Sequence, residues 1–380
     1  MDITARKDIL FITDVSHIRS VRDGGVQICT KEYACLLQKA GFDIHEHAIR
    51  HTRKLYKRFK IKLGIGVYDR YDFEELFSSI EEKLLQKKIE YVALNQVALS
   101  GFAEMIKARF GNTITILLLS HGNESGDFLH EIVRAESKSL IHKARDIIRL
   151  GLFVFKESIF FAKHVDLVLS MSSTEFEINK WLGAKAGLFV PRTFSPDFLD
   201  LMPRNDRVGF VGTLDHLPNS AGLEQFLTEF EKVNVNKVKL RLVGGPATIG
   251  LLLENKFSCV KYLGLLDDEA LKQEAASWSC SINPVFWYSR GASTKLAQLL
   301  NWGLPVVTTE AGNRGYTWTN GILQNARDAK DMAGLLVKIS ADSKLIEDCA
   351  RQSRLVANSG PAMENIALKL KSALQDLKKY

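Results

Sequence analysis

The chain has few features of a secreted or metal-binding protein. Its 380 residues contain five cysteines, which lie far apart and form no Cys-x-x-Cys or Cys/His pattern. We therefore expect free thiols and no structural zinc. The first residues carry charges in place of the apolar core of a signal peptide, and no apolar run is long enough to span a membrane. These absences favour a cytoplasmic protein, either soluble or peripheral at the inner face of the membrane.

The order of the apolar segments predicts two parallel α/β domains, in keeping with a length that exceeds one typical core. Short buried strands alternate with amphipathic helices and glycine-bearing loops, as in Rossmann-like domains. We predict strands at 8–14, 42–48, 91–94, 114–119, 167–170 and 187–190, and again at 207–212, 239–245, 260–263, 280–284 and 305–309. The predicted organisation is an N-terminal domain at 1–195, a C-terminal domain at 206–362 and a closing helix at 363–380.

The segment Gly291–Thr309 carries the strongest signal for ligand binding. Small residues open it, a helix with Lys295 and Gln298 in its first turns follows, and Gly303 ends that helix before a β-branched strand. A helix N-terminus after a small-residue loop favours phosphate, because its first amides have no intrahelical partner and the helix dipole favours anions. Lys295 would then contact phosphate and Gln298 a hydroxyl group. The alternatives are a solvated lysine and ordinary turn glycines.

The second half of the chain resembles the family 4 type of GT-B glycosyltransferases (glycosyl transferases group 1). The resemblance rests on segments in the family's order and spacing, namely Phe210–Leu227, Leu240–Pro246, Val260–Gly264, Ser281–Pro284 and Gly291–Thr309. It implies a GT-B fold, in which two Rossmann-like parallel-sheet domains face each other across a cleft. The C-terminal domain would bind a nucleotide-sugar, UDP- or GDP-linked, and the N-terminal domain a glycan or lipid-linked acceptor.

Carried over by position, the resemblance implies a set of donor-binding residues: Gly24, Gly25, Gly212, Thr213, Gly264, Leu265, Arg290, Gly291, Ser293, Thr294, Lys295 and Gln298. Arg290 and Gln298 stand where the family has the two glutamates of its E-x7-E pattern, and an amide at Gln298 can still pair with ribose hydroxyls. The catalytic candidates are His121, Glu124 and Asp23, with Asp14 and His17 on nearby loops as rivals. A histidine satisfied by backbone carbonyls is the alternative reading of His121.

The resemblance favours a retaining glycosyltransferase that works without a metal or cofactor, acting in surface glycan or lipid-linked saccharide assembly. No Asp-x-Asp pattern suited to a divalent ion is present. A nucleotide-sugar epimerase of the same fold and a non-catalytic sugar-nucleotide-binding protein are the alternatives. A glycosyltransferase acting on DNA is a more remote one.

A cationic cluster lies between Arg50 and Lys62, where seven Lys/Arg alternate with apolar and aromatic residues and no acidic residue occurs. We expect Arg53, Lys54, Lys57 and Arg58 to contact an anionic membrane or the acceptor. The same composition suits a nucleic-acid backbone, which is less favoured because the cluster is single and local. A solvated loop is the third reading.

Overall fold

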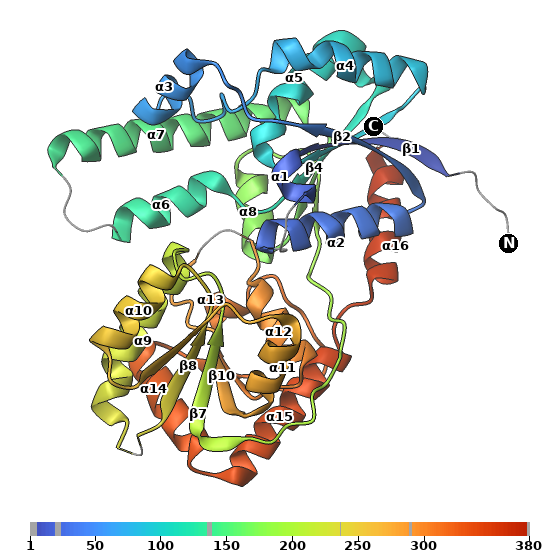
Figure 1. Cartoon of the computed structure of the whole chain (residues 1–380). Coiled ribbons are helices and arrows are strands. Elements are labelled where there is room, and N and C mark those ends of the chain that lie inside the picture. Colours follow the sequence, from blue (N-terminus) through green and yellow to red (C-terminus); the bar gives the residue numbers. More distant parts are fainter. Residues whose placement is uncertain (1–5, 20–23, 135–138, 236, 289–290, 378–380) are drawn as a thin grey trace, which may run out of the picture. The chain divides into compact units, whose positions relative to one another are not determined.

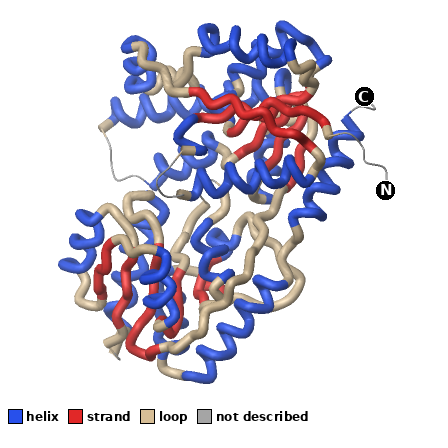
Figure 2. Tube along the Cα trace, turned by 45° about the vertical axis from the view of Figure 1, so that its right-hand side comes forward, coloured by secondary structure: helices blue, strands red, loops and turns tan. Residues whose placement is uncertain are grey.

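A computed structural model describes residues 6–19, 24–134, 139–235, 237–288 and 291–377. The chain forms two compact units, drawn in Figures 1 and 2. Unit 1 comprises residues 1–191 and 362–380, and unit 2 comprises residues 192–361. Within the described ranges, no helix is long and apolar enough to cross a membrane.

Unit 1 is built on a six-stranded parallel sheet in the order β2-β1-β3-β4-β5-β6. Its strands are β1 (Lys7–Asp14), β2 (Phe42–Ile49), β3 (Tyr91–Asn95), β4 (Thr115–Ser120), β5 (Leu167–Ser170) and β6 (Gly187–Phe189). Successive side chains point to opposite faces of a strand, and both faces are buried here. Leu10 and Ile12 belong to one hydrophobic cluster, whereas Ile9 and Phe11 belong to another.

Helices cover both faces of this sheet (Figure 2). They are α1 (Val15–Ile18), α2 (Gly25–Lys39), α3 (Leu55–Leu63), α4 (Phe73–Gln86), α5 (Gly101–Phe110), α6 (Glu124–Arg134), α7 (Leu140–Ile159), α8 (Ser173–Trp181) and α16 (Met363–Leu377). A π-helical turn, Phe160–His164, follows α7, and 3-10 turns form at Val97–Leu99 and Gly111–Thr113.

The C-terminal helix α16 is part of unit 1. Its residues Ile366, Leu370 and Leu374 are buried in the same cluster as Tyr33 and Leu36 of α2. The prediction treated 363–380 as a separate closing helix; its apolar stripe instead completes the core of the first unit.

Unit 2 repeats the architecture with the strand order β12-β11-β10-β7-β8-β9, again parallel. Its strands are β7 (Arg204–Val211), β8 (Lys239–Val243), β9 (Val260–Gly264), β10 (Trp278–Ile282), β11 (Val306–Thr309) and β12 (Gln324–Ala326). Its helices are α9 (Leu217–Val233), α10 (Ala247–Lys256), α11 (Asp268–Ala276), α12 (Thr294–Asn301), α13 (Glu310–Asn313), α14 (Ala329–Ser340) and α15 (Ser343–Asn358).

The second unit begins earlier in the chain than predicted. The amide of Arg192 donates to the carbonyl of Gly315 at 2.9 Å, and Phe194 stacks on Tyr316 at 5.5 Å between ring centroids. Residues 192–195, which the prediction assigned to the first domain, therefore pack on the second. Their backbone and aromatic contacts lie far away in sequence, so the local pattern could not reveal them.

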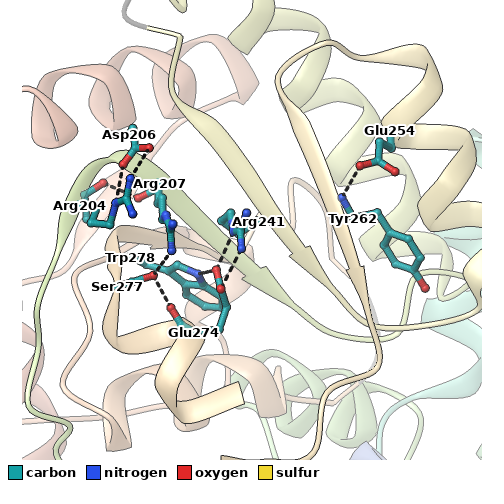
Figure 3. Close-up of polar contacts among 10 residues, drawn as sticks. Arg204, Asp206, Arg207, Arg241, Glu254, Tyr262, Glu274, Ser277 and Trp278 are labelled. Atoms are coloured by element: carbon teal, nitrogen blue, oxygen red, sulfur yellow. Dashed lines mark hydrogen bonds and ion pairs between the residues drawn. The ribbon is translucent and has the colours of Figure 1, made fainter. Parts of the chain in front are cut away.

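Trp278 fixes the start of β10, two residues before the predicted strand 280–284. Its indole packs over Gly209 of β7, where an added Cβ would lie 1.9 Å from the ring. The indole N–H donates to Glu274 at 3.0 Å, and the Arg241 guanidinium donates to both oxygens of the same carboxylate at 2.7 and 2.9 Å (Figure 3). This network attaches α11 to strands β8 and β10 of the sheet.

Candidate functional site

Both sheets contain a topological switch point, where the order of strand addition reverses. It lies between β1 and β3 in unit 1 and between β7 and β10 in unit 2. Ligands of open α/β sheets bind outside the carboxyl ends of the strands at such a point. The candidate residues are therefore described at these two places in turn.

Glycines bring the backbone loops of unit 2 close together after β7, β8 and β9. The Gly244 amide donates to the Gly264 carbonyl at 2.9 Å, and the Gly212 amide donates to the Val243 carbonyl at 3.1 Å. An added Cβ on Gly244 would lie 1.9 Å from the Gly212 oxygen. Gly244 and Gly264 also have φ of +146° and +76°, which disfavour other residues. Such loops let a ligand diphosphate approach the backbone closely.

Lys295 extends from the first turn of α12 to the loop after β7. Its Nζ donates to Asn219 Oδ1 at 2.6 Å and lies 5.7 Å from the centre of the Phe210 ring. The Asn219 amide nitrogen donates to the Thr213 carbonyl at 2.7 Å, which turns the amide oxygen toward the lysine. The Lys295 side chain also lies against Gly212. The structure thus brings Gly212, Thr213 and Lys295 together, as three of the predicted donor-binding residues.

The electrostatic environment of Lys295 favours an anionic ligand. Burial of the ammonium, together with the positive charge of Arg314, lowers the pKa of Lys295 to about 7. The hydrogen-bond partner is a neutral amide, and the charged neighbour that shifts the pKa is another cation. A bound diphosphate would compensate both positive charges.

Side chains from three other segments hold the N-terminus of α12 in place. Ser293 Oγ donates to Asn283 Oδ1 at 3.2 Å, and the Asn283 amide nitrogen donates to Thr308 Oγ1 at 3.2 Å. The Tyr316 hydroxyl hydrogen-bonds the Ser293 carbonyl and accepts from the Ala297 amide at 3.2 Å. Asn283 and Tyr316 were not among the predicted site residues. Asn283 follows a buried strand directly, a signal that could have identified it.

The remaining donor-site candidates of unit 2 flank this centre. Thr294 is the first residue of α12, and Gln298 lies one turn after Lys295 and is half-buried. Gly291 is buried with φ of +69°, and Leu265 is exposed beside Gly245. Arg290 lies outside the described residues. The second cation near Lys295 is instead Arg314, which no local pattern indicated.

The two N-terminal glycines lie in unit 1, at the start of α2. Gly24 is the N-cap residue, and its amide donates to the side-chain oxygen of Gln27 at 2.9 Å; Gly25 is the first residue of the helix. Asp23, the third catalytic candidate, lies outside the described residues.

Asp14 is the central carboxylate at the switch point of unit 1. It is buried at the end of β1, where one oxygen accepts from the Ser16 amide at 2.8 Å and the other from the Tyr71 hydroxyl at 3.2 Å. His51 Nε2 lies 3.4 Å from the second oxygen. Burial opposes the charge, but the hydrogen bonds from Ser16 and the nearby His51 and His17 lower the pKa of Asp14 overall. Asp14 is therefore a charged anchor at neutral pH.

His121 follows β4 and is oriented by Asn95 at the end of β3. The Asn95 amide nitrogen donates to Thr13 Oγ1 at 2.8 Å and to Thr30 Oγ1 at 2.9 Å, so its oxygen is turned toward His121 Nε2 at 2.6 Å. We infer from this network that Nε2 carries the proton that Asn95 Oδ1 accepts. The partner of His121 Nε2 is thus the side chain of Asn95 and not a backbone carbonyl.

Glu124 begins α6, and its carboxylate lies 3.9 Å from the Arg70 guanidinium. Glu157 of α7 is fully buried and accepts from the Asn123 amide nitrogen at 3.3 Å, which holds the turn before Glu124. Glu157 accepts from Tyr68 at 2.7 Å and from Ser125 Oγ at 2.6 Å. Burial raises the pKa of Glu157 to about 7 although these hydrogen bonds oppose the shift. Glu157 therefore positions the His121–Glu124 turn.

His51 and Tyr71 are the residues of this cluster that sequence reasoning missed. His51 follows β2, and Tyr71 lies in the connection between α3 and α4. His51 belongs to the Arg50–Lys62 segment, whose interpretation rested only on its positive charge, whereas Tyr71 lies outside every predicted motif. The approach of both residues to Asp14 depends on tertiary folding.

The two parallel sheets define the class of the protein, which has the GT-B glycosyltransferase fold. Residues 205–342 match the family described as Glycosyl transferases group 1. The resemblance noted in the sequence is confirmed over that part of unit 2. No curated protein sequence matches the chain.

Solved structures match nearly the whole chain. Sucrose-phosphate synthase from Thermosynechococcus elongatus has a TM-score of 0.68 at 17% identity, covering 98% of this chain and 100% of that chain. HepE from Anabaena, in complex with UDP and glucose, has a TM-score of 0.62 at 13% identity, with coverage of 98% and 100%. TarM has a TM-score of 0.60 at 12% identity, with coverage of 98% and 99%. At such identities the likeness shows the fold.

Proposed function

We propose that the protein transfers a sugar from a nucleotide-sugar to a hydroxyl acceptor, in surface glycan or lipid-linked saccharide assembly. The observation that carries the proposal is the half-buried Lys295, held between a glycine-lined backbone and a second cation. The match to glycosyl transferases group 1 supports it. So does HepE, a protein of the same fold solved with UDP-glucose.

In this proposal unit 2 binds the donor. The diphosphate lies against Gly212, Thr213 and the start of α12, and Lys295 neutralises the charge that develops on the leaving nucleoside diphosphate. Gln298 pairs with ribose hydroxyls, and the backbone at Gly264 and Leu265 meets the edge of a uracil or guanine base. These cations and the dipole of α12 take the role that a metal has elsewhere, so neither metal nor cofactor is required.

Unit 1 would bind the acceptor, with Asp14 and His121 at its switch point as hydroxyl ligands. We propose retention of configuration. The bond from the anomeric carbon to phosphate breaks, the acceptor oxygen bonds to that carbon from the same side, and the hydroxyl proton passes to the departing diphosphate. His121, held in place by Asn95, would help to position the acceptor at this switch point.

A thermal-shift screen against UDP-, GDP-, ADP- and dTDP-sugars tests donor binding, because a ligand that binds the folded state stabilises it. We expect one base to raise the melting temperature and Lys295→Ala to remove that shift, whereas Lys338→Ala, on the exposed face of α14, keeps it. An equal shift in Lys295→Ala would refute the placement of the donor. NMR of the product with the identified donor then gives the anomeric configuration.

A nucleotide-sugar epimerase is the second candidate, because the ionised carboxylate of Asp14 at the switch point of unit 1 could accept a proton from a sugar. Incubation with the donor alone separates the two activities. An epimerase converts the donor to its isomer without an acceptor, whereas a transferase leaves it intact or hydrolyses it slowly. Donor binding without either reaction would indicate a non-catalytic sugar-nucleotide-binding protein.

A further inference from the structure

Helix α7 has a continuous apolar stripe that faces solvent. The stripe consists of Leu140, Ile141, Ala144, Ile147, Ile148, Gly151 and Phe155. At helical spacing these residues span roughly 120° of the circumference, and the large side chains among them are 58% to 83% exposed. The opposite side of the helix carries the buried Phe153 and packs in the core of unit 1. Helix α7 therefore has two apolar surfaces: one packs in the core of unit 1, and the stripe faces solvent.

The exposed charges that α7 itself places beside this stripe have one sign. Lys143 and Arg145 flank it and are exposed, whereas the two acidic residues of α7, Asp146 and Glu157, are buried on the other side. Arg145 lies 3.5 Å from the buried carboxylate of Asp146 and keeps nearly half of its side chain exposed. The exposed surface of α7 is therefore apolar with a cationic border.

Helix α3 repeats this pattern. Its apolar residues Leu55, Tyr56, Phe59 and Leu63 form one stripe that is 44% to 78% exposed, and no residue of α3 is buried. Arg58, Lys60 and Lys62 are exposed around the stripe, and α3 contains no acidic residue.

Two of the four cations predicted for a membrane or acceptor surface are engaged within unit 1. Lys54 lies 3.4 Å from Asp72 and 3.0 Å from Glu75, and Lys57 lies 3.1 Å from Asp72 and donates to the Tyr71 carbonyl. These contacts attach the start of α3 to unit 1. Arg53, just before the helix, and Arg58, Lys60 and Lys62 within it are exposed.

The two helices are neighbours on the surface of unit 1. Gly64, which ends α3, has the Arg145 and Arg149 side chains of α7 as its nearest neighbours. Beyond it, Lys156 of α7 lies 3.5 Å from Asp69. Both views of the trace show α3 beside α7 (Figures 1 and 2).

We propose that α3 and α7 together form a docking surface for an anionic phospholipid bilayer. The apolar stripes would enter the region between headgroups and acyl chains, and Arg58, Lys60, Lys62 and Lys143 would contact lipid phosphates. Tyr56 suits the headgroup level, because its ring is apolar and its hydroxyl polar. This surface lies in unit 1 and is separate from the donor-binding residues of unit 2, so it does not depend on the proposed donor.

The charge pattern favours a bilayer over other occupants. A second copy of the chain seated symmetrically on these stripes would place its cationic border against the same border, which is repulsive. A nucleic acid would pair with the cations but would leave the aliphatic stripe of α7 in water. Anionic lipid supplies both negative charge and apolar volume.

Co-sedimentation of the full chain with vesicles tests the proposal, using phosphatidylcholine with and without phosphatidylglycerol. We expect binding that requires phosphatidylglycerol and decreases with salt. The triple variant Arg58→Gln, Lys60→Gln and Lys62→Gln removes three cations. Its partition coefficient onto the vesicles should fall on the order of 100-fold, because each cation changes that coefficient by about fivefold. The matched control removes three exposed lysines of unit 2, with Lys330→Gln, Lys338→Gln and Lys344→Gln, and should bind normally.

The apolar contribution is tested by Ile147→Asp with Ile148→Asp, which should weaken partitioning tenfold or more. Leu252→Asp on α10 of unit 2, also an exposed apolar position, is the control. Circular dichroism melts verify folding of every variant. The proposal is overturned if the wild type does not bind anionic vesicles, or if both sets of variants bind as the controls do. It is also overturned if the isoleucine variants dissociate an oligomer without changing vesicle binding.

Discussion

Binding of the nucleotide-sugar should weaken as the pH rises above neutrality, because Lys295 must be protonated to pair with the diphosphate. In the free protein the pKa of Lys295 is about 7, against an ordinary value of 10.5, because of burial and the charge of Arg314. A bound diphosphate adds negative charge and raises that pKa toward the ordinary value. Binding is therefore coupled to proton uptake between these two values.

The size of the effect follows from this linkage. The protein must take up a growing fraction of one proton on binding, so the dissociation constant should rise roughly 25-fold from about pH 6.5 to about pH 8.5. Isothermal titration with the nucleotide-sugar found by the thermal-shift screen measures it. An intact nucleotide-sugar is preferable to the free nucleotide, because a terminal phosphate titrates near the lower end of this range.

Lys295→Met provides the decisive comparison, since it keeps the length of the side chain and removes the charge. It should weaken binding at low pH by about 2 kcal/mol, the value of a hydrogen bond to a charged group, and should abolish the pH dependence. Lys338→Met, at an exposed position of α14, should leave both unchanged. The reasoning fails if the wild-type dissociation constant is constant over this range, or if Lys295→Met retains the wild-type slope.

Three further outcomes follow from the packing. Burial raises the pKa of Glu157 from 4.5 to about 7, so its contribution to the free energy of unfolding should fall as the pH rises from 4.5 through 7. Unfolding measured as a function of pH should show that Glu157→Gln gains about 3 kcal/mol of stability relative to wild type by about pH 8. Gly244→Ala should lower the free energy of unfolding by about 3 kcal/mol and abolish the thermal shift caused by the nucleotide-sugar. Gly264→Ala should lower it by only about 1 kcal/mol, because the added Cβ meets no atom within 4 Å. Equal losses of stability would contradict the steric argument. Leu370→Ala should destabilise unit 1 by about 3 kcal/mol and increase hydrogen exchange in α2 while unit 2 stays protected.

Much of the fold could be predicted because parallel strands buried on both faces read as short apolar runs. The predicted strands at 8–14 and 167–170 agree with β1 and β5 to within a residue. The three-residue edge strand β12 was missed, since so short a segment has no distinct period. The sequence pattern also did not predict helix α3, because none of its residues is buried and its apolar stripe faces solvent.

The sequence by itself determined most of the strands, their parallel arrangement, and the importance of the Gly291–Thr309 segment with Lys295 near its helix start. These properties depend on residues that are close in the chain, through periodicity, capping and small-residue loops. Only the tertiary structure decided which groups surround that lysine. Asn219, Arg314 and the Gly244 loop come from separate strand ends, and their convergence follows from the strand order of unit 2. Arg290 and Gln298 replace the two glutamates of the family pattern. The site around Lys295 is instead cationic and lined by glycines, and no single segment of the chain encodes that combination.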